Sequence, residues 1–127
     1  MSIVDKIENL KQITGYLGAA VFTPEGKMIG GVTEVARINF EIAGSLFHDL
    51  FLITQNQSRE AGFGNTDTIL LYTKNGIILG QSFDQKDIHF HTILALDIQA
   101  NVAMAKLILN KTMIILAEEV KKLYKDS

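Results

Sequence analysis

Hydrophobic residues along this chain of 127 residues follow two different spacings, and the changes between them divide the sequence into elements. Apolar residues three and four positions apart predict helices, and short apolar runs bounded by glycine, proline or asparagine predict strands. No linker, repeat or low-complexity stretch interrupts the pattern, so we expect one domain over residues 1–127. The predicted order is α-β-β-α-β-β-β-α, over about residues 3–14, 17–23, 28–32, 34–59, 66–73, 77–83, 89–98 and 101–124.

Short motifs mark the ends of several elements. Ser2, followed three residues later by Asp5, resembles a capping box at the start of the first helix. Residues 23–27 read Thr-Pro-Glu-Gly-Lys, which favours a turn because proline presets φ and glycine accepts positive φ. Asn75 and Gly76 form the dipeptide that best tolerates two positive φ angles in a hairpin. Both strand pairs around these turns are therefore predicted to be hairpins.

The predicted helix over residues 34–59 carries two neighbouring apolar stripes. At about 100° per residue, the two stripes together cover about half of the helix circumference. A helix that packs on one surface needs only about 100° of apolar arc. We therefore expect this helix to pack against two surfaces. The first stripe consists of Ala36, Phe40, Ala43, Phe47, Leu50 and Phe51, and the second consists of Val35, Ile42, Leu46 and Ile53.

Composition and charge exclude several classes of protein. Hydrophobic residues make up 47% of the chain and charged residues 20%, which is below the usual quarter or so. The formal net charge of −2 provides no basic surface for nucleic acid or anionic lipid. The absence of cysteine excludes disulfides, thiolate metal sites and a cysteine nucleophile. No apolar run reaches the roughly 18 residues that span a bilayer, and no secretion signal is visible, so we expect a cytoplasmic protein without direct membrane insertion.

Two histidines provide the only candidate metal ligands with a suitable spacing. His89 and His91 lie on the same face of a predicted strand, at a spacing that can hold a metal ion. A third ligand is not evident, because His48 lies on the predicted middle helix and Asp97 lies six residues after His91. We therefore interpret His89 and His91 as partly exposed strand residues and expect no metal site.

The sequence shows no arrangement of residues that indicates an active site. Ser45 and His48 share one face of the middle helix, but no strained turn or oxyanion-binding loop accompanies them. The glycines at 30–31 and 62–64 lack the spacing and the strand-to-helix context of a phosphate-binding loop. Acidic residues are scattered rather than paired in an apolar setting. We expect a binding protein without catalytic residues or a cofactor.

The order of elements and several short stretches resemble the roadblock/dynein light chain family, in particular its small single-domain prokaryotic members. The resemblance covers nearly the whole chain, and its motifs are mainly small and apolar positions. The stretches that carry it are Gly15-Tyr16-Leu17-Gly18-Ala19-Ala20-Val21-Phe22, Pro24-Glu25-Gly26, Thr68-Ile69-Leu70-Leu71-Tyr72, Asn75-Gly76 and Asp97-Ile98 ahead of Asn101.

The resemblance implies a fold and a mode of dimerisation. The family fold is a three-layer α/β/α sandwich with profilin-like or longin-like architecture. In it, a five-stranded antiparallel sheet has the long middle helix on one face and the two terminal helices on the other. Family members form homodimers or heterodimers in which the third strands pair and the middle helices lie side by side, which would account for the wide apolar arc. The residues expected in a homodimer interface are Leu46, Phe47, Leu50, Ile53, Ile69 and Leu71.

The resemblance also implies a function, namely regulation or scaffolding of a Ras-like small GTPase that binds across the paired middle helices. Arg37 and Arg59 are the only arginines, but relatives that stimulate hydrolysis act by repositioning the GTPase's own residues rather than by supplying an arginine finger. One alternative is a dimerisation adaptor that links non-GTPase partners without affecting GTP hydrolysis. Another is a small-molecule sensor, which would need an apolar pocket with convergent polar groups. The candidate partner-binding residues form a polar stripe on the middle helix: Arg37, Glu41, Ser45, His48, Leu52 and Gln55.

Overall fold

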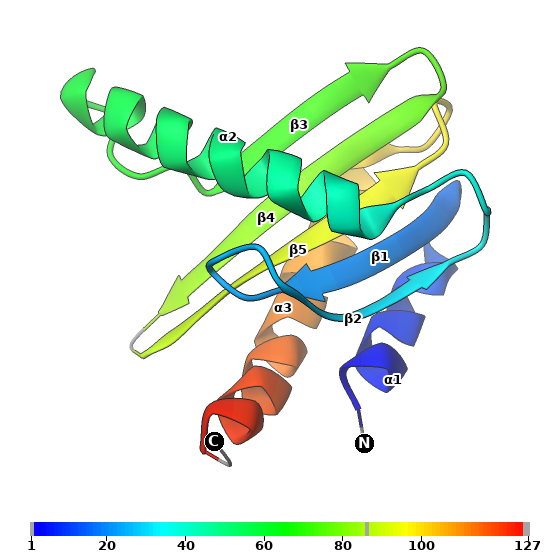
Figure 1. Ribbon diagram of the computed structural model, residues 1–127. Coiled ribbons are helices and arrows are strands. Elements are labelled where there is room, and N and C mark those ends of the chain that lie inside the picture. The colour runs from blue at the N-terminus through cyan, green and yellow to red at the C-terminus, as the bar shows by residue number, and fades with distance from the viewer. Residues whose placement is uncertain (1, 86, 126–127) are drawn as a thin grey trace.

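Residues 2–85 and 87–125 are described by the computed structural model. Within them, five strands form one antiparallel sheet, and helices lie on both of its faces (Figure 1). This arrangement confirms the predicted α+β class and the α-β-β-α-β-β-β-α order. In chain order the elements are α1 (Ile3–Ile7), the 3₁₀ helix η1 (Glu8–Gln12), β1 (Tyr16–Phe22), β2 (Met28–Thr33), α2 (Phe40–Glu60), β3 (Thr68–Thr73), β4 (Gly76–Gln85), β5 (Ile88–Leu96) and α3 (Val102–Lys125).

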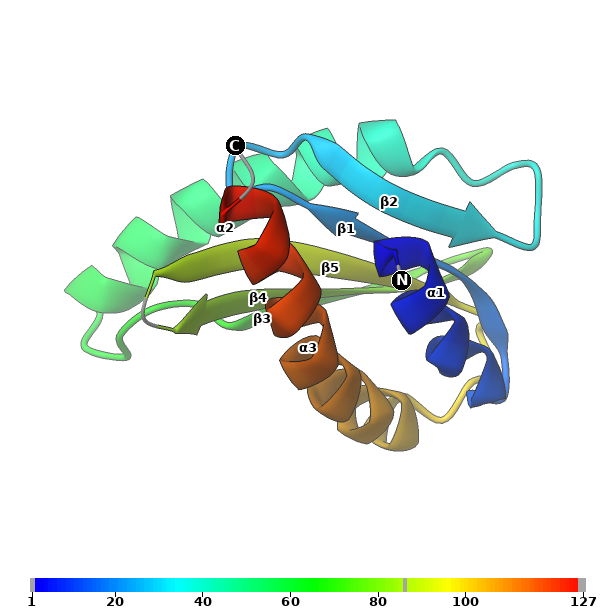
Figure 2. The same cartoon turned by 90° about the horizontal axis from the view of Figure 1, so that it is seen from below.

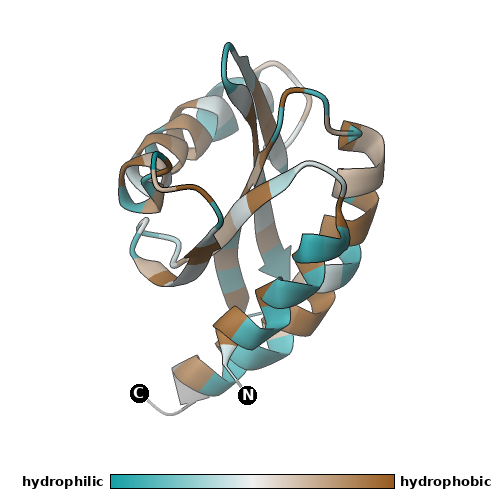
Figure 3. Ribbon diagram, turned by 90° about the vertical axis from the view of Figure 1, so that its right-hand side faces the viewer, coloured by the Kyte–Doolittle hydropathy of each residue, from teal (hydrophilic) through white to brown (hydrophobic). Residues whose placement is uncertain are grey.

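The elements are stacked in three layers. The strand order is β2-β1-β5-β4-β3, so β5 is central and β2 and β3 form the two edges. Helix α2 covers one face, and α1, η1 and α3 cover the other (Figures 1 and 2). Figure 3 shows hydrophobic residues on both helical layers and on the strands between them. The predicted sandwich, with the middle helix on one face and the terminal helices on the other, is confirmed.

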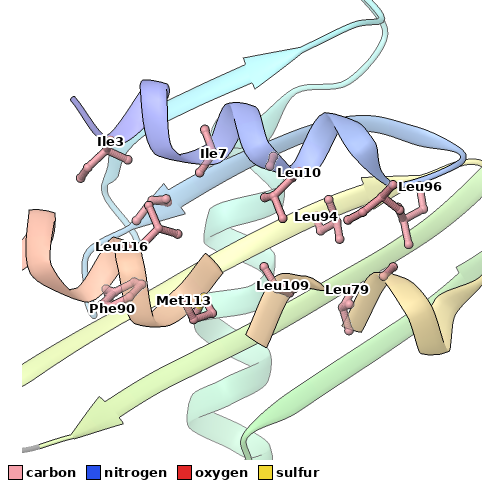
Figure 4. Close-up of a cluster of buried hydrophobic side chains, with 14 of the residues drawn as sticks. Ile3, Ile7, Leu10, Leu79, Phe90, Leu94, Leu96, Leu109, Met113 and Leu116 are labelled. Atoms are coloured by element: carbon pink, nitrogen blue, oxygen red, sulfur yellow. The ribbon is translucent and has the colours of Figure 1, made fainter. Parts of the chain in front are cut away.

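The larger core lies between the sheet and the two terminal helices. Leu109 and Leu116 of α3 point toward Ile7 and Leu10 of the N-terminal segment and toward Leu94 of the central strand (Figure 4). All five side chains are fully buried. These contacts explain why the apolar residues of α3 repeat at helical spacing, since only one face of that helix meets the sheet.

The smaller core lies between the sheet and α2. Phe40, Phe47 and Phe51 are the large buried side chains of this helix. Two glycines make room for aromatic rings, since a Cβ on Gly44 would collide with the ring of Phe22 and a Cβ on Gly80 would collide with the ring of Phe47. The close approach of α2 to the sheet therefore depends on residues without a side chain.

Helix α2 begins at Phe40 rather than at Glu34, so the predicted start is wrong by six residues. The side chain of Asn39 accepts hydrogen bonds from the backbone N–H groups of Glu41 and Ile42, at 3.0 and 3.1 Å. This N-cap satisfies backbone groups that the first turn leaves without a partner inside the helix. The predicted stripe residues at positions 35 and 36 therefore belong to the connection before α2.

Two further details differ from the prediction. The first helix divides into α1 and η1 and ends two residues earlier than expected, although the capping box formed by Ser2 and Asp5 is confirmed. Gly76 is already the first residue of β4. It is needed there because a Cβ would lie 2.8 Å from the carbonyl oxygen of Leu96, and not because of a positive φ angle.

Candidate functional site

Helix α2 has an exposed apolar row in addition to its buried face. Ile42, Leu46 and Ile53 are 68%, 45% and 61% exposed. Half-buried Ala43 and Leu50 lie between this row and the buried phenylalanines, at the helical spacing of about 100° per residue. Three of the four residues of the predicted second stripe are therefore exposed in the single chain, whereas Val35 precedes the helix and is half-buried.

The exposed row faces the side of the sheet that ends in β3. A groove of about 330 Å³ separates the first half of α2 from the β3–β4 hairpin, and Ile42, Leu46 and Thr73 are among its lining residues. On β3, Ile69 and Leu71 are half-buried and pack toward α2. Within the described residues, β3 pairs with β4 alone, so its outer edge has backbone groups without a strand partner. Figure 1 shows β3 as the outermost strand on this side.

Phe47 does not share this surface. It was predicted as an interface residue, but it is 1% exposed and its ring packs on Gly80 of β4. On a helix, Leu46 and Phe47 point about 100° apart, so one can be exposed while its neighbour is buried. The interface set that remains accessible or half-buried in the single chain is Leu46, Leu50, Ile53, Ile69 and Leu71.

The opposite flank of α2 presents the polar stripe. Glu41, Ser45 and Leu52 are exposed, and His48 and Gln55 are half-buried. This flank lies beside the β1–β2 turn, where the His48 ring meets the backbone of residues 24–26. The polar stripe and the apolar row therefore lie on different sides of one helix.

Arg37 is not part of this stripe. It precedes α2, and its Nη2 donates a hydrogen bond of 3.3 Å to the carbonyl oxygen of Asn75 at the β3–β4 turn. Because α2 begins only after its N-cap Asn39, Arg37 is not helical, and its side chain does not follow the spacing of the polar stripe. Arg37 lines the apolar groove, on the flank opposite to His48.

The structure brings all three histidines of the chain to one cavity of about 220 Å³. His48 comes from α2, whereas His89 and His91 come from β5. The sequence places His48 more than forty residues from the other two and gives no signal of their proximity. The three histidines come together because α2 crosses the sheet near the β4–β5 turn.

Hydrogen bonds orient two of these imidazoles. Nδ1 of His48 lies 3.0 Å from the carbonyl oxygen of Pro24, which can only accept, so Nδ1 carries the proton. Nδ1 of His89 lies 2.5 Å from a carboxylate oxygen of Asp84 across the β4–β5 hairpin. Both contacts fix a ring orientation and leave Nε2 as the second nitrogen.

His91 is held by burial and stacking. Its ring stacks on Phe51 with centroids 4.8 Å apart, and its Nδ1 is buried without a hydrogen-bond partner among the described residues. Burial, followed by the neighbouring His48, lowers the pKa of His91 to about 4, although Asp84 acts in the opposite direction. His91 is therefore neutral near physiological pH.

The cavity does not form a metal centre in this structure. Within residues 2–85 and 87–125, no group of three or more His, Asp or Glu side chains is arranged to hold a metal ion. The same part of the chain contains no helix with the length and hydropathy of a bilayer span.

The surface around α2 provides apolar contact, an open strand edge and hydrogen-bonding groups. These are features of a protein-binding surface.

No protein-family model and no curated protein matches the sequence. Comparison with solved structures does find similar chains. A structure of MglB with a tetrameric arrangement superposes with a TM-score of 0.77 at 13% identity, covering 94% of this chain and 86% of that one. The roadblock/LC7 domain from Streptomyces avermitilis superposes with a TM-score of 0.75 at 9% identity, covering 98% and 99%.

Profilin IB from Acanthamoeba castellanii is also similar, with a TM-score of 0.58 at 12% identity over 91% of this chain and 94% of that one. This likeness confirms the predicted profilin-like architecture. The likeness to the Streptomyces domain agrees with the family resemblance inferred from the residues around Gly15 and Asn101. At these identities the comparisons establish the three-dimensional arrangement of the chain. The protein has the roadblock/LC7 fold.

Proposed function

We propose that this protein is a homodimeric regulator or scaffold of a Ras-like small GTPase, which binds across two paired α2 helices. The observation that carries the proposal is the exposed row of Ile42, Leu46 and Ile53 beside the open edge of β3. The roadblock/LC7 fold supports it, because the family resemblance implies a dimer that binds such a GTPase.

Dimerisation through this side of the molecule would pair the open edge of β3 and bury the exposed row of α2. Pairing of β3 with β3 of a second copy gives partners to the backbone groups of the edge and extends the sheet. The same approach brings the two apolar rows of α2 together, which removes Leu46 and Ile53 from water. A two-fold axis between the copies makes the surface self-complementary, as is usual in homodimers.

The polar stripe is the proposed binding surface for the GTPase. Glu41, Ser45 and Leu52 lie on the other flank of α2 and stay accessible when the apolar rows are paired. Leu52 is 53% exposed among polar neighbours, the setting of an anchor residue in a protein interface. By binding there, the dimer would hold the switch loops of the GTPase in one nucleotide state.

The dimer is tested by the mass in solution. We expect about twice the 14.1 kDa mass of the chain from light scattering at low protein concentration. Leu46→Asp places a charge in the exposed row and should reduce that mass while the circular dichroism spectrum stays unchanged. Ser45→Asp, at the preceding residue and outside the row, is the matched control. An unchanged mass for Leu46→Asp would refute this interface.

GTPase binding is tested with the Ras-like GTPases encoded near the gene in the same genome. We expect one of them to be captured in its GDP state or its GTP-analogue state, and a hydrolysis assay then reports whether turnover changes. Leu52→Asp should weaken capture at least tenfold, whereas Leu123→Asp, an exposed leucine of α3, should not. Failure of every GTPase to bind in either state would contradict the proposal.

The same assays distinguish the adaptor alternative. An adaptor would bind a non-GTPase chain through the polar stripe and leave GTP hydrolysis unchanged. In that case Leu52→Asp would abolish binding of that chain, and the dimer mass would be unaffected.

A further inference from the structure

The outer face of α3 carries a second apolar row that is exposed in the single chain. Met104, Leu107, Ile114 and Ile115 are all exposed, and Ile114 is 66% exposed. At about 100° per residue they lie opposite the buried face of the helix, which includes Leu109 and Leu116. A surface helix packed on one side is expected to be polar on the other, so this row indicates a binding face.

Three charged residues, Lys111, Glu118 and Lys122, project from the same face of α3 as this row. Lys111 and Glu118 are both exposed and are seven residues apart, so they project within about 20° of the same direction, two turns from each other. Ile114 and Ile115 flank the midpoint between them. Along the helix, the face therefore consists of Met104 and Leu107, then Lys111, Ile114, Ile115, Glu118 and Lys122.

We propose that this face binds the same face of a second copy, with the two α3 helices antiparallel about an axis between Ile114 and Ile115. In this register Lys111 of each copy lies opposite Glu118 of the other, and Ile114 of each copy lies opposite Ile115 of the other. Leu107 then lies over the aliphatic part of Lys122 of the second copy. The surface is therefore complementary to itself in its pattern of charges.

Other arrangements of the two helices are less favourable. Parallel packing puts Lys111 opposite Lys111 and Glu118 opposite Glu118, which juxtaposes like charges. An antiparallel axis at Lys111 or at Glu118 has the same defect at its centre. The register centred on Ile114 and Ile115 pairs Lys111 with Glu118 and keeps these two isoleucines in the middle. In this interface the charges choose the register, and apolar burial provides the affinity.

This pairing is independent of the proposed α2 dimer. The two surfaces belong to opposite layers of the sandwich, so one chain can use both at once (Figure 2). A chain with two self-complementary surfaces forms species larger than a dimer. If the α2 dimer does not form, the α3 pair still predicts a dimer on its own.

The first test is a mass measurement in the Leu46→Asp background, where the α2 surface is disabled. Sedimentation velocity should give twice the chain mass of 14.1 kDa at high protein concentration. Adding Ile114→Asp should reduce it to the mass of one chain, whereas adding Asn110→Asp, a neighbouring exposed position, should not. Ile53→Asp replaces Leu46→Asp if that variant fails to fold. A monomer at every concentration in the Leu46→Asp background, or a dimer that survives Ile114→Asp, would overturn the proposal.

The second test is charge reversal in the same Leu46→Asp background. Lys111→Glu and Glu118→Lys alone should each raise the dissociation constant of the α3 pair at least tenfold, because each creates two like-charge contacts. The two changes together should restore it to within about threefold of the value with native charges. Absence of this restoration would exclude the Lys111–Glu118 register.

The third test uses the absence of cysteine from the sequence. Mixing the Lys111→Cys and Glu118→Cys variants under mild oxidation should give a disulfide-linked pair of chains. Either variant alone should give much less, because residue 111 faces 118 and not itself. Equal cross-linking in the mixture and in the single variants would contradict the antiparallel arrangement.

Discussion

Helices α2 and α3 lie on opposite faces of one sheet, and each has a buried face and an exposed apolar row. In α2 the exposed row is connected to the buried face through Ala43 and Leu50 and lies beside a strand edge. In α3 the row is opposite the buried face and shares its side of the helix with Lys111, Glu118 and Lys122. The same excess of apolar residues therefore has a different structural setting in each helix.

The difference indicates how strong and how specific each surface should be. A partner on the α2 side can add backbone hydrogen bonds along β3 to the apolar contact, so we expect the tighter association there. A partner on α3 has side-chain contacts alone, so we expect a weaker association whose register depends on Lys111 and Glu118. The amount of exposed apolar surface would not by itself distinguish these two cases.

The largest expected effect separates the buried face of α2 from its exposed row. Phe47→Ala removes a fully buried ring that packs on Gly80 and should lower the free energy of unfolding by about 3–5 kcal/mol. Leu46→Ala, one residue earlier and 45% exposed, should leave the fold of the single chain nearly intact. Urea denaturation at a fixed protein concentration measures both. Equal losses in the two variants would mean that the two faces of α2 are not distinct.

A smaller loss in the free energy of unfolding should come from acid, through protonation of His91, which stacks on Phe51 of α2. The pKa of His91 in the folded chain is about 4, below the value of 6.5 for a free imidazole. The unfolded chain therefore binds the proton more readily, and the stability due to neutral His91 is present above pH 6.5 and is lost as the pH falls toward 4. We expect a loss of about 2 kcal/mol over this range, after allowing for partial solvent access.

The His91→Gln variant checks this assignment. Its free energy of unfolding should fall less than that of the native chain between pH 6.5 and 4, with chemical denaturation as the measurement. His89→Gln, on the same strand but exposed, removes the contact with Asp84 and measures how much of the acid response belongs to that pair. Identical pH profiles for the native chain and His91→Gln would show that burial of this imidazole does not govern the acid response.

The smallest expected effect compares the starts of the two long helices. Asn39 accepts two backbone hydrogen bonds at the start of α2, and Asn101 accepts one of 3.0 Å from Met104 at the start of α3. Asn39→Ala should therefore cost about 1 kcal/mol, and Asn101→Ala the same or somewhat less. Thermal unfolding followed by circular dichroism measures the loss of stability in each of the two variants. A larger loss for Asn101→Ala would reverse the expected ranking.

Much of the fold could be predicted from local sequence patterns. The element order and the strand turns follow from helical spacing, short apolar runs and turn residues, which depend on near neighbours in the chain. The start of α2 was missed because Val35 and Ala36 continue the apolar spacing backwards, whereas the helix begins only after Asn39, whose side chain caps its first turn. The spacing of apolar residues does not show at which position a side chain caps the helix.

The candidate site was predictable only in part. The wide apolar arc correctly indicated that α2 has more apolar surface than the sheet can cover. Phe47 was assigned to the wrong half of that arc, because a sequence shows the width of an apolar face but not which side meets the sheet. The cavity shared by His48, His89 and His91 was not predictable, since it depends on where α2 crosses the β4–β5 hairpin.

The sequence by itself determined the alternation of helices and strands and the apolar excess of the middle helix, since both follow from residue spacing along one element. The tertiary structure decided which half of that excess is buried, that α3 has an exposed apolar row, that β3 is an edge strand, and that His48 shares a cavity with His89 and His91. The physical reason is that burial is a property of contacts between elements. It depends on the strand order and on where a helix crosses the sheet, and these are fixed when the layers pack together.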